Sequence, residues 1–192
     1  MVEPYLIVDI ETCPLDIDRY LSLDEERQKE LINPIDSKII ALGIRHDGKN
    51  KIFLGDNEKE ILEKFWSELD AIKKQHPTIS IAGFSITNFD LPFITARSFI
   101  HGITISPFTI KQTIDLREKI NAYRYGPTRG KLKDYASILG LKVLDIEGKD
   151  IPHLHKNKNQ DEIKEYLLND LELTDALYKR AIKTNIIKIV KW

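Results

Sequence analysis

Acidic side chains that could hold a metal ion occur in three short motifs of the sequence. In the first, an apolar run leads into Asp9 and Glu11, which are two residues apart. Residues two apart on a strand face the same side, so these carboxylates should project together while Ile10 enters the core. Adjacent carboxylates repel each other unless a cation neutralises them, and hard divalent cations prefer carboxylate oxygen. A strand end exposed to solvent, where acids are harmless, is the alternative interpretation.

The second and third motifs add two carboxylates and a tyrosine. Asp90 follows Phe89 at the start of an expected helix, a position suited to a helix cap and also to an active-site group at a strand-to-helix corner. Tyr166 and Asp170 are four residues apart on another expected helix, so the phenol and the carboxylate can reach the same point. An exposed aspartate beside a half-buried core tyrosine is the alternative for this pair.

Apolar periodicity predicts the elements that must position these motifs. Strands are expected at residues 5–8, 38–46, 51–54, 78–84 and 113–116, with a hairpin turn at Asp47-Gly48. Helices are expected at about 24–32, from Asp56 or Asn57 to before Pro77, and at 90–100, 131–139 and 161–183. Residues 148–160 are expected to be irregular. Three strands followed by alternating helices and strands predict a mixed α/β sheet flanked by helices.

Composition limits the class of protein. The chain has 192 residues, 42% hydrophobic and 31% charged, which suits one globular domain over residues 1–192. The formal net charge of −1 means that nucleic-acid binding would need a local basic patch and metal ions. Cys13 is the only cysteine, which excludes an internal disulfide and a thiolate zinc site and favours a cytoplasmic location. The sequence indicates neither a signal peptide nor a membrane span.

The order of the three motifs resembles the DEDD superfamily of 3′→5′ exonucleases, in the branch with tyrosine in the third motif (DEDDy). The chain is most similar to the proofreading exonuclease domains of family B DNA polymerases, here as a free-standing protein. The similar segments are Asp9 to Thr12, Gly83 to Phe93, and Tyr166 with Asp170. The resemblance spans roughly residues 3–180. It implies a ribonuclease H-like fold with a mixed five-stranded sheet, in which strands 1–3 are antiparallel and the later strands are parallel.

The resemblance also implies a reaction and its catalytic residues. Two divalent cations, Mg²⁺ or Mn²⁺, would be held by the four acids of the motifs: Asp9, Glu11, Asp90 and Asp170. They would hydrolyse single-stranded nucleic acid, DNA in the first place, from the 3′ end to nucleoside monophosphates. Tyr166 would orient the attacking water, since a tyrosine pKa near 10 favours orientation over general-base action. Glu165 stands where the other DEDD branch has histidine, so the tyrosine branch fits better.

Substrate contacts are expected from two further groups of residues. A basic cluster could hold phosphates, with Tyr123 or Tyr125 stacking on a base: Arg124, Arg129, Lys131 and Lys133. A solvated loop with its tyrosines packed beneath it is the alternative. The resemblance adds Thr12, Ser85 and Phe89, although Phe89 could equally fill the core. Family B domains usually carry asparagine at the position of Ser85, so the contact with the substrate terminus is expected to be weaker here.

Three rival functions stay open. An RNA exonuclease would use the same site, because only a contact to the 2′-OH distinguishes the polymers. A catalytically silent nucleic-acid-binding or polymerase-associated subunit is compatible with Ser85, but an unused cluster of like charges would cost stability. A ribonuclease H-type endonuclease shares the fold and metals but lacks the Tyr-x-x-x-Asp helix. The pathway (proofreading, repair or RNA turnover), a replication or repair partner, the oligomeric state and the role of the tail from Ile186 also stay open.

Overall fold

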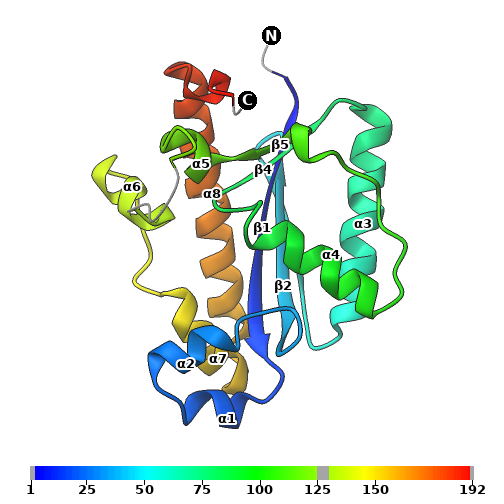
Figure 1. Ribbon diagram of the computed structural model, residues 1–192, viewed down its shortest axis with the longest axis vertical. Helices are drawn as coiled ribbons and strands as arrows, with labels where there is room; N and C mark the ends of the chain where they lie inside the picture. Colours follow the sequence, from blue (N-terminus) through cyan, green and yellow to red (C-terminus); the bar gives the residue numbers. More distant parts are fainter. Residues whose placement is uncertain (1–2, 125–129, 191–192) are drawn as a thin grey trace.

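Five strands form one mixed sheet at the centre of the protein (Figure 1), as seen in a computed structural model that describes residues 3–124 and 130–190. Their spatial order is β3-β2-β1-β4-β5. The bounds are β1 (Tyr5–Pro14), β2 (Ser37–His46), β3 (Lys49–Leu54), β4 (Ser80–Gly83) and β5 (Thr113–Asp115). The strands β1, β2 and β3 pair antiparallel, whereas β4 runs parallel to β1 and β5 parallel to β4. The predicted fold class, three antiparallel strands followed by parallel ones, is confirmed.

Helices cover both faces of this sheet. The α-helices are α1 (Ile17–Leu21), α2 (Glu25–Glu30), α3 (Glu58–Gln75), α4 (Asp90–Ile100), α5 (Leu116–Ile120), α6 (Leu132–Ile138), α7 (Ile151–Lys156) and α8 (Gln160–Lys183). The 3₁₀ helices are η1 (Ile110–Gln112), η2 (Gly148–Asp150) and η3 (Ile186–Lys188). Figure 1 shows α3 and α4 on one side of the sheet and α8 on the other. Within the described residues, none of the helices combines the length and apolar character needed to cross a membrane.

The side chains of β1 alternate between the two layers. Leu6, Val8 and Ile10 belong to the apolar core shared with α3 and α4. Ile7 packs with residues of α8, and Cys13 does the same at the other end of the strand. The odd-numbered residues of β1 therefore face α8. The expected strand 5–8 is too short, because buried acids within a strand look like a strand end in the sequence.

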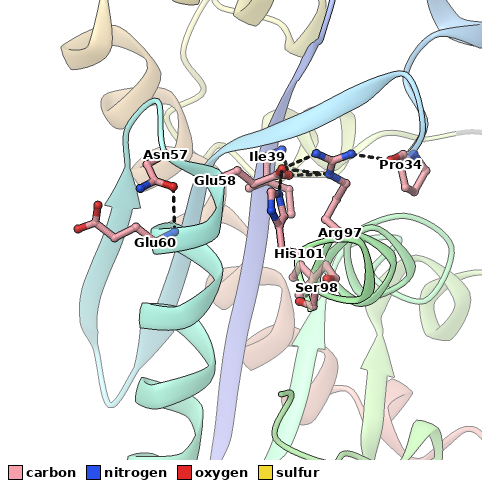
Figure 2. Close-up of polar contacts among 9 residues, drawn as sticks. Pro34, Ile39, Asn57, Glu58, Glu60, Arg97, Ser98 and His101 are labelled. Atoms are coloured by element: carbon pink, nitrogen blue, oxygen red, sulfur yellow. Dashed lines mark hydrogen bonds and ion pairs between the residues drawn. The ribbon is translucent and has the colours of Figure 1, made fainter. Parts of the chain in front are cut away.

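A buried polar network fixes α3 and α4 to the start of β2 (Figure 2). The carboxylate of Glu58, in the first turn of α3, accepts hydrogen bonds from the Ile39 backbone N–H at 2.7 Å and from Arg97 Nη2 at 2.5 Å. His101 Nε2 lies 2.7 Å from the same carboxylate, and Arg97 Nη1 donates to the Pro34 carbonyl at 3.0 Å. Because Glu58 and Arg97 are only 5% and 6% exposed, each charge depends on the other for compensation.

The prediction that residues 148–160 are irregular is wrong, because this stretch contains η2 and α7. Pro152 lies in the first turn of α7, a position where its missing N–H costs nothing, and Ile151 beside it is buried. His153 and His155 therefore lie on a helix and not in a loop. A helix of this length spans less than two full turns, so it leaves no apolar period to detect.

The segment after α8 covers part of the core. Ile186 and Ile187 pack against the apolar cluster that includes Leu177 and Tyr178 of α8, and Lys119 Nζ donates a hydrogen bond to the Ile189 carbonyl. Of the roles left open for this tail, core covering is seen for Ile186 and Ile187, whereas Val190 is 76% exposed.

Candidate active site

Three carboxylates of the sequence motifs converge between β1 and α8. Asp9, Glu11 and Asp170 each bring a carboxylate oxygen within 4.8 Å of the others. Gly43 of β2 lies opposite Asp9 in the sheet, and a Cβ atom there would be 2.7 Å from Leu171 Cδ1 on α8. The missing side chain thus lets α8 approach the sheet closely enough for Asp170 to reach the two acids of β1.

Asp90 joins this group from the other layer. It is the first residue of α4, and its Oδ1 accepts a hydrogen bond from the Ile10 backbone N–H at 3.1 Å. The residue that caps α4 is Phe89, which makes no side-chain cap, so the interpretation of Asp90 as the helix cap is wrong. Its side chain binds β1 between Asp9 and Glu11 instead. The N-terminal end of α4 also favours a negative charge at this position.

Burial and mutual repulsion keep the pKa values of these acids high. Burial, followed by the charges of Asp90, Glu11 and Asp170, raises the pKa of Asp9 well above its usual range. Burial and then the charges of Asp170 and Asp90 do the same to the pKa of Glu11. Burial raises the pKa of Asp90 to about 7 and that of Asp170 to about 6.

Tyr166 and Lys133 border the carboxylates. Burial, and then the charges of Glu11, Asp170 and Asp9, raise the pKa of Tyr166 above its usual value, so its phenol stays protonated. Lys133 Nζ lies 4.6 Å from the centre of the Tyr166 ring and donates to the Leu144 carbonyl at 3.1 Å. The ammonium group thus holds the ring in place, and its charge lowers the pKa of Glu11 and Asp170.

The cluster has the chemistry of a divalent cation site. Oδ1 of Asp170 is buried and has no hydrogen-bond partner among the described residues, an arrangement that a bound cation would satisfy. Every candidate donor is a carboxylate oxygen, the ligand that Mg²⁺ and Mn²⁺ prefer over softer donors. A cation would also compensate the burial of these charges and the repulsion that further raises the pKa of Asp9 and Glu11. The residues present therefore fit the metals that the resemblance implies.

A hollow of about 310 Å³ opens beside the acids of β1. Glu11, Thr12 and Phe89 line it, together with residues of α1, α2 and η2: Tyr20, Glu25, Gln28, Lys29, Gly148 and Lys149. The Phe89 ring is half-buried, with its centre 5.5 Å from that of Phe93. Phe89 thus packs on the core and also borders the hollow. Thr12 is 9% exposed.

A second hollow of about 550 Å³ lies on the α8 side and is rich in lysine. Tyr166 and Asp170 form part of its wall. Four lysines also line it: Lys29, Lys131, Lys133 and Lys149. Glu25, Lys29, Gly148 and Lys149 border both hollows, so the two hollows are adjacent. Lys131 and Lys133 were named from sequence as candidate phosphate contacts, whereas Lys29 and Lys149 were missed, because isolated lysines in a charged segment give no signal.

Among the other expected substrate contacts, Arg124 and Ser85 do not line these hollows. Arg124 is exposed and lines neither hollow, and Arg129 falls outside the described residues, as does Tyr125. The Tyr123 ring lies 5.6 Å from Lys119 Nζ. Ser85 also lines neither hollow, and its Oγ is 3.4 Å from Arg117 Nη1.

Asp115 is a further buried acid, and its role is structural. It lies at the end of β5 and is 3% exposed. Its carboxylate accepts from the Ser85 and Thr87 backbone N–H groups, each at 3.1 Å, and from the Thr87 hydroxyl at 2.7 Å. These bonds fix the turn that connects β4 to α4, and so fix the position of Asp90.

The comparisons agree with this geometry. Residues 21–146 match the family described as the DNA polymerase family B exonuclease domain, a range that includes Asp90 but not the first and third motifs. An uncharacterized protein of Methanocaldococcus jannaschii is 32% identical over 173 residues, which are 82% of this chain and 93% of that protein. The structure of the family B DNA polymerase from Pyrobaculum calidifontis matches 97% of this chain with a TM-score of 0.71 and 16% identity. The chain spans 25% of that polymerase.

The family match covers well over half of the chain and includes both the second motif and the Asp115 strand that positions it. The fold of the polymerase extends the likeness to the strand and helix that carry the first and third motifs. The chain therefore belongs to the exonuclease-domain family of the family B DNA polymerases.

Proposed function

We propose that this protein is a metal-dependent exonuclease that removes nucleotides from the 3′ end of single-stranded nucleic acid, with DNA as the first candidate. The convergence of Asp9, Glu11 and Asp170, with Asp90 bound to the strand between the first two, is the observation that supports it most. Membership of the exonuclease-domain family supports the same activity. The cluster is costly without metal, because three of its acids are buried and the fourth, Asp9, lies beside them.

The four acids would hold two Mg²⁺ or Mn²⁺ ions. Bound there, such ions supply an activated water and stabilise the charge that develops on the phosphodiester. The protein contributes a rigid frame: two acids on the central strand, one on α8 and one at the start of α4. Because β1 and β4 lie side by side at the centre of the sheet, this frame changes little when substrate enters.

Tyr166 would orient the attacking water. Its phenol is protonated, since its pKa lies above the usual value, so it can donate or accept a hydrogen bond but cannot act as a strong base. The Lys133 ammonium against the ring limits how far the phenol can move. Tyr166 thus acts by positioning the water, and Lys133 acts by positioning Tyr166.

The two hollows suggest a path for the strand. The terminal nucleotide would enter the hollow lined by Glu11, Thr12 and Phe89, where the phenylalanine ring can contact a base. The phosphates would lie along the lysines of the second hollow. Only a single strand can place its last phosphodiester across the carboxylates while both hollows are filled.

The test is the cleavage of 5′-labelled single-stranded DNA and RNA of matched sequence, with Mg²⁺, with Mn²⁺ and with EDTA, beside an Asp9→Ala variant. We expect a ladder that shortens from the 3′ end, requires metal and is abolished in the variant. The polymer that is degraded faster identifies the substrate class. Intact substrate in every lane, with binding still visible in a gel shift, would refute the enzyme and favour a nucleic-acid-binding scaffold.

A further inference from the structure

A second group of metal-ligating side chains lies at the opposite end of the sheet. His46 ends β2, Asp47 begins the turn to β3, and His76 follows α3. Each offers one ligand atom, and the three atoms lie within 4.8 Å of one another. His46 is next to Tyr5, at the start of β1, whereas Asp9 lies four residues further along that strand. The two groups are therefore separated by roughly 13 Å of β-strand.

The backbone fixes the three positions. Asp47 and Gly48 have φ angles of 48° and 75°, the left-handed pair of a tight hairpin turn, which holds Asp47 beside His46. The His76 N–H donates to the Ile72 carbonyl at 2.9 Å, and its carbonyl accepts from the Ile79 N–H at 3.0 Å. The ligand positions are thus defined by the fold itself.

His46 has the tautomer that a metal ligand needs. Its Nδ1 lies 2.9 Å from the Tyr5 carbonyl oxygen, and because a carbonyl can only accept, Nδ1 must carry the hydrogen. Nε2 then keeps its lone pair in the neutral ring. A bond from the other ring nitrogen to a backbone carbonyl is the usual outer partner of a metal-bound histidine.

The separations suit ligands that share one ion. Nε2 of His46 is 3.5 Å from Asp47 Oδ2, longer than a good hydrogen bond. Two ligands on a tetrahedral ion with bonds of about 2.0–2.1 Å are separated by roughly 3.3 Å. The His46 and His76 rings meet edge to face, with centres 5.3 Å apart and an angle of 67°, and one nitrogen of each ring lies within 4.8 Å of the other. The C-terminal end of the 18-residue helix α3 also favours a cation beside His76.

We propose that His46, Asp47 and His76 bind a divalent transition-metal ion of the Zn²⁺ class, with at least one coordination position left for water. Two imidazole nitrogens and one carboxylate favour such an ion over Mg²⁺ or Ca²⁺, which prefer the all-oxygen set of the carboxylate cluster. The ion would join the β2–β3 hairpin, at the edge of the sheet, to the end of α3. Through the Tyr5 carbonyl it would also hold the start of β1.

The test follows the ring nitrogens of all five histidines by NMR in the full chain during titration with ZnCl₂. We expect one equivalent of Zn²⁺ to shift His46 and His76 and to leave His101, His153 and His155 in place. Zn²⁺ bound to Asp9, Glu11 and Asp170 would not produce these shifts, because that group of ligands contains no histidine. Bound Zn²⁺ should also raise the unfolding temperature.

Matched variants complete the test. His46→Gln and His76→Gln should each weaken the Zn²⁺ binding that the remaining ring of the pair reports by NMR at least tenfold, and should reduce the rise in unfolding temperature. His153→Gln, which changes an exposed histidine on α7, should behave as the wild type. Unchanged His46 and His76 signals in excess Zn²⁺ would overturn the proposal. So would undiminished binding in both variants. Neither result would bear on exonuclease activity.

Discussion

At the scale of single residues, the ionised acids of the candidate site are destabilised when no metal is bound. Burial raises the pKa of Asp90 to about 7 and that of Asp170 to about 6, against an ordinary aspartate value near 4 in the unfolded chain. Between about pH 4 and pH 7 the folded protein therefore binds more protons than the unfolded chain. The contribution of these two acids to the free energy of unfolding falls as the pH rises through this window.

The pH dependence of stability checks this electrostatic interpretation. In EDTA, the loss of stability between about pH 4 and pH 7 should be smaller in Asp90→Asn than in the wild type, because asparagine keeps the oxygen that accepts from Ile10 but does not titrate. Mn²⁺ should raise the unfolding temperature more at pH 7.5 than at pH 5. Thermal unfolding followed by circular dichroism measures both. Parallel pH profiles of the two proteins would contradict the assignment.

The backbone of Ser85 is in a strained conformation. Its φ of 64° lies in the left-handed region, which asparagine tolerates better than serine. We expect Ser85→Asn to raise the free energy of unfolding by about 0.5–1 kcal/mol. Ser85→Ala is the control, since alanine gains nothing in this conformation. Urea unfolding compares them, and equal stability of the asparagine and alanine variants would show that strain is not the cause.

At the scale of elements, the Glu58–Arg97 network holds α3 and α4 in register with β2 (Figure 2). Arg97→Met should leave the buried Glu58 carboxylate without its guanidinium partner, with a loss of about 3–5 kcal/mol in the free energy of unfolding. Arg27→Ala, which removes an exposed partner of Asp24, should cost less than about 1 kcal/mol. Chemical denaturation measures both. A similar small loss in the two variants would mean that the network is not stabilising.

The elements also show what the sequence can and cannot predict. The hairpin at Asp47-Gly48, the α3 helix and the last helix were predicted, because turn chemistry and long apolar periods are local signals. Of the two caps expected for α3, Asp56 or Asn57, the structure has Asn57. The short helices α1 and α7 were not. The length of β1 was also missed, since its acids are buried only through contact with α8 and α4.

The site shows the same limit. The motif acids could be named from sequence, but their convergence depends on long-range contacts, such as Gly43 against Leu171. The expected helix-cap role of Asp90 is wrong, because the nearby Ile10 N–H on another element is its partner. Lys29 and Lys149 reach the site from polar segments that contain no motif, so the local sequence did not indicate them.

At the scale of the whole molecule, a net charge of −1 does not attract a nucleic acid. Any electrostatic attraction of the substrate must therefore come from the lysines of the second hollow. Binding to single-stranded DNA should weaken with salt, with a slope of about −0.7 for each phosphate contacted. In an Asp9→Asn background, where the substrate stays intact, Lys29→Ala with Lys149→Ala should reduce the slope by about 1.4. Fluorescence polarisation over a salt series measures it.

The control for this prediction is Lys59→Ala with Lys64→Ala, two exposed lysines of α3 that pair with glutamates of the same helix. This pair changes the net charge equally but lies on another element. It should leave the slope unchanged. The same slope change in both double variants would mean that overall charge, and not the lysine-lined hollow, governs binding.

The most direct measurement is the single-turnover release of the 3′-terminal nucleotide from end-labelled single-stranded DNA in Mn²⁺. The wild type is compared with Asp9→Asn and Asp170→Asn, which preserve side-chain shape but remove the charges. Wild-type protein should release a nucleoside monophosphate. Both variants, folded and still binding the strand, should be slower by at least about a hundredfold. Release at the wild-type rate by either variant would contradict a carboxylate-held metal site, and an intact strand with wild-type protein would contradict the exonuclease itself.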